Sequence, residues 1–176
     1  MKETVRYIVG YLLGFSVFIV LIPLGLYKLS QSDYLLEGRV LFYSDILRYV
    51  LSGVFCLVGA IFAIWSNIFL FMVGKGGPAD AFGVSISPQT RKLVTVGPYR
   101  YCRNPMMFGA FSLYLSVVLY LNSILGLACL IFFLGLLIVL MKLSEEKRLL
   151  KDFGAEYTEY KKKVPMFFPG LRIKRR

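Results

Sequence analysis

Long apolar segments without charged residues constrain this chain more than any other feature of its sequence. Tyr7 to Tyr27 and Tyr49 to Val73 contain no Asp, Glu, Lys or Arg. Two further apolar runs, Met106 to Leu121 and Ile124 to Met141, are separated only by Asn122-Ser123. A helix needs about 20 apolar residues to cross roughly 30 Å of hydrocarbon. The sequence therefore predicts an all-α integral membrane protein with four transmembrane helices, of which the third and fourth form a tight hairpin.

The first apolar segment is predicted to be a membrane anchor. It is too long for a signal peptide and has no small-residue cleavage site near its end. The whole chain is 57% hydrophobic over 176 residues, which is unusual for a soluble domain of this size.

The net charge of +11 is unevenly distributed along the chain. Residues 1–6 carry +1, 28–48 are neutral, 74–105 carry +4 and 142–176 carry +6. Basic residues beside membrane spans favour the cytoplasmic side. We therefore expect both termini and the 74–105 segment to be cytoplasmic. Because the charge lies next to membrane spans, attraction to anionic lipid explains it better than nucleic-acid binding.

The residue types that are missing exclude several kinds of chemistry. The chain has no histidine, so His-based triads, His metal ligands and a histidine general base are excluded. Its three cysteines, Cys56, Cys102 and Cys129, have no metal-ligand spacing, and two of them fall within apolar runs. The sequence supports neither a disulfide framework nor a metal site.

Residues 97–107, GPYRYCRNPMM, place many hydrogen-bonding groups before the third apolar run. Asn104 and Pro105 are typical of the N-cap and first position of a helix. Arg103 beside such a helix start could bind an anion, or it could only anchor the topology. The run Met106 to Leu121 would reach about 24 Å, less than the hydrocarbon thickness. We therefore expect this helix to begin below the membrane surface, in a recess.

Two acidic residues, Glu145 and Glu146, follow the fourth apolar run within an otherwise basic region. Helical spacing would allow both to pair with Lys142, and Glu145 also with Arg148. The short turn at 122–123 makes the third and fourth spans antiparallel, so Arg103 and Glu145 should emerge side by side. A cation and a carboxylate facing each other would suit a zwitterionic ligand.

The tail beyond residue 150 has an amphipathic pattern. Phe153, Tyr157, Tyr160 and Val164 recur at helical spacing among lysines. This pattern predicts either a helix lying on the membrane surface or a lid over a bound cofactor.

Taken in order, these motifs resemble the isoprenylcysteine carboxyl methyltransferase family, whose relatives include phospholipid methyltransferases. The resemblance extends from Gly74 to Pro169, and the first 70 residues match only as apolar spans. The motifs are Leu93-Val94-x-x-Gly97-x-Tyr99-x-x-x-Arg103-Asn104-Pro105-Met106, Glu145-Glu146, Phe153-Gly154-x-x-Tyr157-x-x-Tyr160 and Val164-Pro165. Their ordered combination is more specific than any one of them.

The resemblance implies an enzyme that binds S-adenosylmethionine on the cytosolic side and takes a lipophilic acceptor from the bilayer. Arg103 and Glu145 are the expected catalytic residues, with Arg103 and Asn104 holding the cofactor carboxylate. The expected cofactor-binding residues are Arg91, Lys92, Leu93, Val94, Tyr99, Arg103, Asn104, Pro105, Met106, Met107 and Glu145. Met141, Lys142 and Glu146 are expected to lie towards the substrate.

Three positions depart from the family pattern. Asn104 stands where the family usually has His, and Met107 stands where it usually has Tyr. Met141 stands where eukaryotic carboxyl methyltransferases have an arginine for the substrate carboxylate. The acceptor therefore need not be an isoprenylcysteine, and a carboxylate, a thiol and an amine all remain open.

The sequence divides into N-terminal spans (1–73), a methyltransferase core (74–170) and a basic tail (171–176). The expected location is the inner membrane of a bacterium, and the expected partners are membrane lipids and a lipophilic acceptor. Two alternatives remain. One is a nicotinamide-dependent reductase of the membrane steroid-reductase type, and the other is a non-catalytic membrane protein with the same fold.

Overall fold

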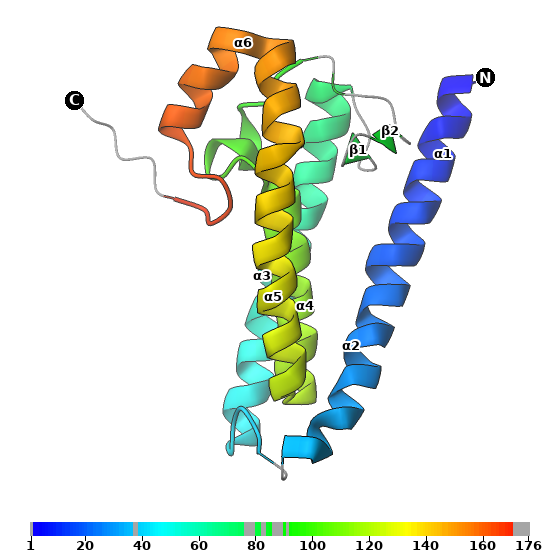
Figure 1. The fold of residues 1–176 in the computed structure, drawn as a ribbon, viewed down its shortest axis with the longest axis vertical. Helices are drawn as coiled ribbons and strands as arrows, with labels where there is room; N and C mark the ends of the chain where they lie inside the picture. The colour runs from blue at the N-terminus through cyan, green and yellow to red at the C-terminus, as the bar shows by residue number, and fades with distance from the viewer. Residues whose placement is uncertain are drawn as a thin grey trace.

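Helices make up almost all of the fold (Figure 1). The computed structural model describes residues 2–36, 39–75, 80–81, 84–85, 90 and 92–170. In chain order the elements are α1 Lys2–Phe15, η1 Ser16–Leu21, α2 Ile22–Ser30, η2 Gln31–Leu36, α3 Asp45–Phe69, η3 Leu70–Gly74, β1 Asp80–Ala81, β2 Val84–Ser85, η4 Gly97–Arg100, α4 Pro105–Leu121, α5 Ile124–Leu143 and α6 Glu145–Lys163. The antiparallel pair β1–β2 is two residues long, so the prediction of a helical fold is confirmed.

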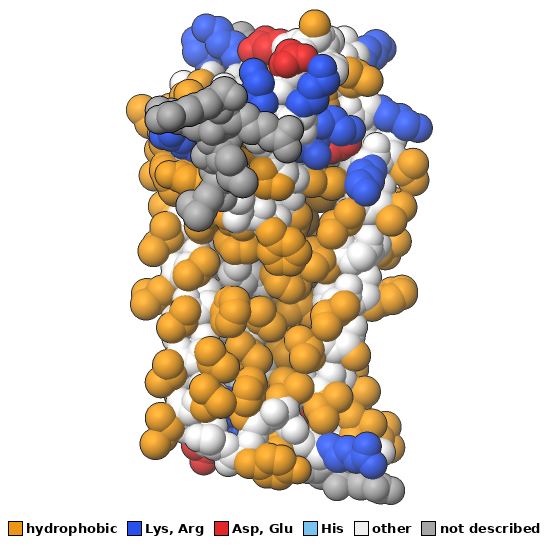
Figure 2. Space-filling model, turned by 90° about the vertical axis from the view of Figure 1, so that its left-hand side faces the viewer, with side chains coloured by type: hydrophobic (Ala, Val, Ile, Leu, Met, Phe, Trp, Pro, Cys, Tyr) orange, Lys and Arg blue, Asp and Glu red, His pale blue; other side chains and the backbone are white. Residues whose placement is uncertain are grey.

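Three helical stretches in the described chain are long and apolar enough to cross a membrane: Leu12–Leu36, Asp45–Gly74 and Ile124–Lys163. The apolar helix α4 has 17 residues and is shorter. By length and composition, these three stretches could each cross a membrane, whereas α4 is apolar but falls short of that length. Figure 2 shows hydrophobic side chains covering the middle of the molecule and charged side chains gathered towards its two ends.

Helices α3 and α4 pack closely because small residues line their contact. A Cβ added at Gly109 would lie 2.6 Å from the Ala63 nitrogen, and one at Gly59 would lie 2.8 Å from the Gly109 oxygen. Ser52 Oγ also donates across the contact to the Ser116 carbonyl at 2.8 Å. Small residues let two membrane helices approach closely enough for their backbones to touch.

Pro23, near the start of α2, explains both the π-helical turn η1 before it and a contact between this helix and α4. The N–H of Ile22 bonds back to Val17 in the π-helical turn η1. Because Pro23 has no N–H to donate, the Phe18 carbonyl is left without a helical donor. Tyr114 of α4 donates its hydroxyl to this carbonyl at 3.0 Å. The first helix is thereby tied to the bundle.

The predicted tight turn between α4 and α5 is present. Asn122 ends α4 in the left-handed conformation, and Ser123 Oγ caps α5 by accepting from the Gly126 N–H at 2.8 Å. The Asn122 amide pairs with both backbone groups of Phe42, each at 2.9 Å. The start of α3 and the α4–α5 turn therefore lie at the same end of the molecule.

The C-terminal helix α6 is broken at Gly154, which has φ 50° and ψ −120°. The part before the break continues from α5, and the part after it turns back along the bundle (Figure 1). Tyr157, Tyr160 and Val164 are buried against Leu93 and neighbouring residues. Of the two placements that the sequence left open, a helix with this face on the membrane surface is wrong, because these residues pack against the protein.

The N-terminus, β1–β2 and α6 lie at one end of the molecule, and the α4–α5 turn lies at the other (Figure 1). The described parts of the three basic segments thus share one end, as the charge distribution predicted. The candidate site lies at this end.

Candidate active site

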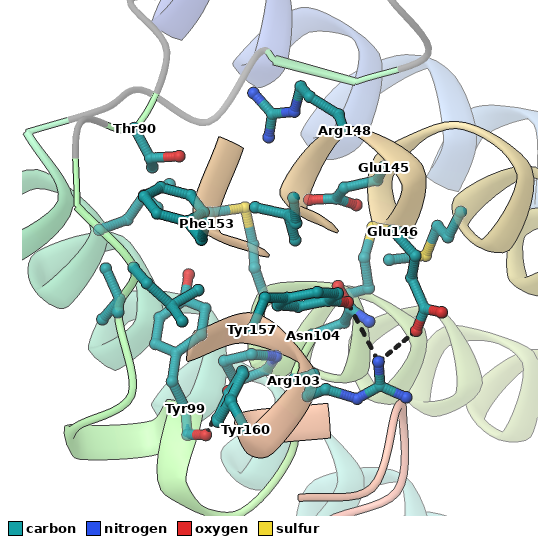
Figure 3. Close-up of a pocket in the computed structure, with 18 of the residues that line it drawn as sticks. Thr90, Tyr99, Arg103, Asn104, Glu145, Glu146, Arg148, Phe153, Tyr157 and Tyr160 are labelled. Atoms are coloured by element: carbon teal, nitrogen blue, oxygen red, sulfur yellow. Dashed lines mark hydrogen bonds and ion pairs between the residues drawn. The ribbon is translucent and has the colours of Figure 1, made fainter. Parts of the chain in front are cut away.

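A cavity lies where the segment before α4, the end of α5 and the folded α6 meet (Figure 3). Polar and apolar side chains from all three parts of the chain line it. The lining residues are Leu70, Thr90, Lys92, Leu93, Val94, Tyr99, Arg103, Asn104, Pro105, Met106, Met107, Met141, Glu145, Glu146, Arg148, Leu149, Phe153, Tyr157 and Tyr160.

Two glycines position the segment that forms one wall of the cavity. A Cβ at Gly74 would lie 3.0 Å from the Val94 side chain and 3.1 Å from that of Thr90. Gly97 has a positive φ of 61°, and a Cβ there would lie 2.6 Å from the Phe69 ring. Both glycines therefore let the wall segment rest directly against the end of α3 and the turn η3.

The chain after α6 pairs with the segment before α4. The Arg103 N–H donates to the Pro165 carbonyl at 2.8 Å, and the Asn104 N–H to the Met166 carbonyl at 3.2 Å. Asn104 Nδ2 also donates to Met166 at 3.0 Å, so its side chain does not cap α4. Asn104 occupies the predicted N-cap position, but its side chain binds the segment that follows α6 instead of capping α4.

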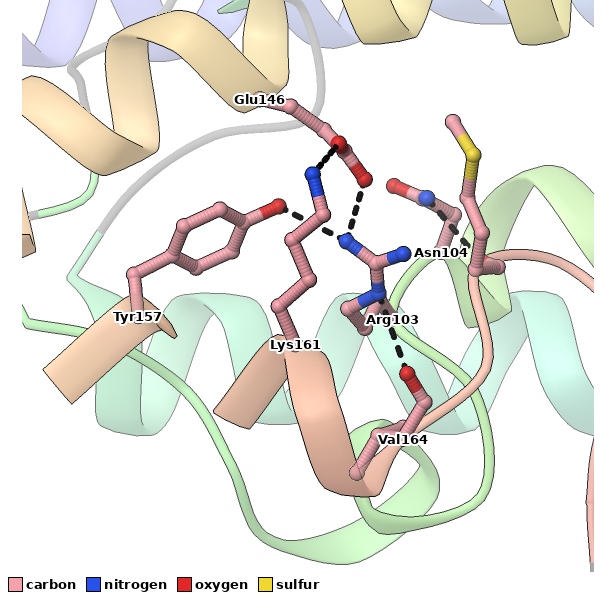
Figure 4. Close-up of polar contacts among 7 residues, drawn as sticks. Arg103, Asn104, Glu146, Tyr157, Lys161 and Val164 are labelled. Carbon is pink, nitrogen blue, oxygen red and sulfur yellow. Dashed lines mark hydrogen bonds and ion pairs between the residues drawn. The ribbon is translucent and has the colours of Figure 1, made fainter. Parts of the chain in front are cut away.

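Arg103 is the centre of a buried polar network (Figure 4). Its Nη1 donates to Glu146 Oε1 and, at 3.1 Å, to the Tyr157 hydroxyl. Its Nε donates to the Val164 carbonyl at 3.1 Å. The Arg103 and Glu146 side chains are each only 10% exposed. Arg103 therefore joins the start of α4 to both halves of α6.

Glu146 bridges two cations. Its second carboxylate oxygen accepts from Lys161 Nζ at 2.5 Å. Burial alone would raise the pKa of Glu146, but the hydrogen bond from Lys161 and the charges of Arg103 and Lys161 outweigh it, so the pKa lies below its usual value. Glu146 is thus ionised at neutral pH. The predicted pairing with Lys142 is replaced by contacts to Arg103 and Lys161.

Three tyrosines contribute hydroxyl groups to the site. Burial raises the pKa values of Tyr99, Tyr157 and Tyr160 above the usual range, so all three stay protonated. Tyr160 donates its hydroxyl to the Tyr99 carbonyl at 2.6 Å. Figure 3 shows the ring of Tyr99 reaching into the cavity with its hydroxyl leading. Tyr99 is therefore placed as a hydrogen-bond donor to a bound molecule.

Glu145 and Glu146 point in different directions. Figure 3 shows the Glu145 carboxylate directed into the cavity, whereas the Glu146 carboxylate turns towards Arg103. The negative charge of Glu145 also contributes to the raised pKa of Tyr99. The cavity thus has a carboxylate and a phenolic hydroxyl near each other.

The cavity brings together most of the residues that the sequence singled out. Of the expected cofactor and substrate residues, Lys92, Leu93, Val94, Tyr99, Arg103, Asn104, Pro105, Met106, Met107, Met141, Glu145 and Glu146 line it. Lys142 is exposed and is not part of the lining. Arg91 lies outside the described residues.

Sequence reasoning missed Leu70, Thr90, Arg148 and Leu149 as lining residues. Arg148 had been considered only as a helical partner of Glu145. Its spacing of three residues from Glu145 was a usable signal, because residues three apart share a helix face.

Comparison with protein families gives one match. The family model described as phospholipid methyltransferase matches residues 47–156, more than half of the chain. The chain belongs to the phospholipid methyltransferase family. No curated protein and no solved structure matches it. Family membership and the apolar helices together make it an integral membrane protein of a methyltransferase family.

The match to the phospholipid methyltransferase family begins within α3, earlier than the resemblance found in the sequence. It ends at residue 156, just before Tyr157. The residues that close the cavity from the far side of the Gly154 break, including Tyr157 and Tyr160, therefore lie beyond the matched region.

Proposed function

We propose that this protein transfers a methyl group from S-adenosylmethionine to a lipophilic acceptor taken from the bilayer. The observation that carries the proposal is a single cavity, at one end of the apolar helices, that combines a carboxylate, cations, tyrosine hydroxyls and methionine side chains. Family membership supports the reaction class.

The chemistry of the lining suits this cofactor. Glu145 can accept a hydrogen bond from an ammonium or a ribose hydroxyl, and Tyr99 can donate one. Phe153 and Tyr157 offer aromatic faces, which favour a nearby sulfonium cation. Leu93 and Val94 add apolar surface for the adenine ring. When bound, the cofactor supplies an electrophilic methyl group on a positively charged sulfur.

The main tasks of the protein residues are orientation and exclusion of water. Tyr157 and Tyr160 are buried and line the cavity from the returning half of α6. A carboxylate or thiolate acceptor needs no proton removed. An amine acceptor must lose a proton. Glu145 is assigned to the cofactor and Glu146 is bound to two cations, so water is left to take that proton.

The acceptor side is expected to be apolar. Met106, Met107 and Met141 line the cavity, and Met141 is only 5% exposed. Methionine is flexible and polarizable, and it adapts to apolar groups of varied shape. Met141 cannot bind a substrate carboxylate as an arginine would. This favours acceptors held mainly by their apolar parts.

The proposal includes four membrane spans, with α4 as the third, in the inner membrane of a bacterium. Both termini and the cavity would face the cytoplasm, where S-adenosylmethionine is made. The basic segments at the cavity end support this orientation.

Isothermal titration of the detergent-purified protein tests the cofactor. S-adenosylmethionine and S-adenosylhomocysteine should bind and NADPH should not. Glu145→Gln should weaken S-adenosylhomocysteine binding roughly tenfold or more, while Glu156→Gln, an exposed glutamate on the same helix, should leave it unchanged. Transfer of isotopically labelled methyl groups to membrane lipids, followed by mass spectrometry, would identify the acceptor. Absence of heat with both adenosyl ligands would refute the proposal.

A further inference from the structure

Arg103, the arginine expected to hold the cofactor carboxylate, is part of the protein's own framework. Three of its contacts, to Glu146, Tyr157 and Val164, join separate segments of the chain. Using its Nη1 for a ligand would mean giving up a buried ion pair. Removing one partner of such a pair is strongly unfavourable. A second cation lines another part of the cavity wall, on the side away from Arg103.

Arg148 is that cation. It lines the cavity and is half-buried in the first turns of α6, where its N–H bonds to the Ser144 carbonyl at 3.0 Å. Figure 3 shows its guanidinium, the Glu145 carboxylate and the Thr90 hydroxyl directed towards the same part of the cavity, away from Arg103. The helix fixes the backbone of Arg148, so only the side-chain torsions determine where its guanidinium lies.

The spacing of Glu145 and Arg148 matches a zwitterion. Residues three apart on a helix have Cβ atoms about 5–6 Å apart. Both side chains line the cavity from this one face of α6. A ligand whose ammonium and carboxylate share one carbon could therefore meet both charges together. Glu145 and Arg148 each also take part in an interaction within the chain, and a ligand would bind in addition to it or in its place.

We propose that Arg148 binds the carboxylate of the amino-acid end of S-adenosylmethionine while Glu145 faces its ammonium. A guanidinium can bind a carboxylate through two parallel hydrogen bonds, so it fixes orientation as well as charge. This inference rests on the proposed function and assigns the anion subsite within it. Arg103 is then a positioning residue that holds α6 in place.

The test compares two ligands that differ in the amino-acid end. S-adenosylhomocysteine carries the ammonium and carboxylate, whereas 5′-methylthioadenosine lacks both. Arg148→Gln should weaken binding of S-adenosylhomocysteine roughly 10- to 100-fold, as expected for loss of hydrogen bonds between charged groups. It should leave binding of 5′-methylthioadenosine unchanged. Both are measured by isothermal titration in detergent.

Lys147→Gln is the matched control, since it removes the same charge from the neighbouring, exposed position. It should leave both affinities unchanged. Unaltered S-adenosylhomocysteine affinity in Arg148→Gln would overturn the assignment. An equal loss for both ligands would also overturn it, because it would indicate a general change in the cavity. Arg148→Lys should recover part of the lost affinity, since the charge returns without the two-pronged geometry.

Failure of this assignment differs from failure of the proposed function. If the unmodified protein binds S-adenosylhomocysteine and Arg148→Gln binds it equally well, only the Arg148 subsite is rejected. If the unmodified protein binds neither adenosyl ligand, the proposed function and the subsite are rejected together.

Discussion

At the scale of single residues, the ion pair between Arg103 and Glu146 holds the site together. Both side chains are 10% exposed, and losing one partner of a buried pair costs roughly 3–5 kcal/mol. We expect Glu146→Gln to lower the melting temperature in detergent by about 5 °C or more. Glu159→Gln, which breaks an exposed pair with Lys162, should leave it unchanged. Melting followed by tyrosine and tryptophan fluorescence would measure both, and equal losses would contradict the assigned role.

The same carboxylate gives the stability a defined pH dependence. Although burial acts to raise its pKa, contacts with Lys161 and Arg103 hold the pKa of Glu146 below the usual value. The stabilisation is therefore complete above the unfolded-state pKa of about 4.3 and is lost as the pH falls through the lower folded-state pKa. The melting temperature of the unmodified protein should fall below about pH 4 more steeply than that of Glu146→Gln. Parallel curves from pH 3 to 7 would count against this.

The sequence predicted that Arg103 and Glu145 would emerge side by side, because the Asn122-Ser123 turn forces α4 and α5 to run antiparallel. It did not predict that Glu146, rather than Glu145, would turn to Arg103. That choice depends on the backbone at Ser144, φ −110° and ψ −70°, which joins α5 to α6 and sets the rotation of α6. Packing of α6 against the rest of the site determines that rotation, so it cannot be derived from residue spacing.

At the scale of elements, Gly154 determines where α6 turns back. Its backbone, φ 50° and ψ −120°, is accessible almost only to glycine, and a Cβ there would meet nothing within 4 Å. Gly154→Ala therefore adds backbone strain of about 1–3 kcal/mol without a steric clash. We expect weaker S-adenosylhomocysteine binding and a lower melting temperature, both measured in detergent. Gly135→Ala, at an open helical position of α5, should change neither property for the worse.

The contact between α3 and α4 permits no side chain at Gly109. Even a methyl group would lie 2.6 Å from a backbone nitrogen, so Gly109→Ala must push the helices apart. The melting temperature should fall by several degrees. Arg103 and Asn104 directly precede α4 and line the cavity, so a shift of α4 should also change the shape of the cavity. A melting temperature equal to that of the unmodified protein would show that the helices can separate at no cost.

The apolar helices were predictable because a membrane helix satisfies its own backbone hydrogen bonds and needs only length and apolar composition. The break in α6 was not predictable, because residues on both sides of Gly154 fit one amphipathic period. A single glycine within such a pattern gives no local sign of a turn. The pairing of Arg103 and Asn104 with Pro165 and Met166 explains why the chain folds back there.

At the scale of the whole molecule, two contacts determine which ends lie together. The Asn122 amide bonds to Phe42, and Arg103 bonds to Glu146. The start of α3, the end of α4 and the start of α5 therefore share one end, while the start of α4 and the end of α5 share the other. Seventeen residues of α4 reach about 26 Å between these ends.

This geometry predicts a four-span topology that labelling can test. The test uses a variant in which Cys56, Cys102 and Cys129 are replaced. A single cysteine is then introduced either at Tyr43, which is 95% exposed, or at the exposed Lys162. A membrane-impermeant thiol reagent on intact cells should label the cysteine at position 43, and should label the one at 162 only after permeabilisation. Labelling of both cysteines from outside would place positions 43 and 162 on the same side of the membrane. That requires an even number of crossings between them. Since α3, α4 and α5 all lie between them, α4 would then fail to cross, and its hydrogen-bonded ends could not belong to opposite faces of the membrane.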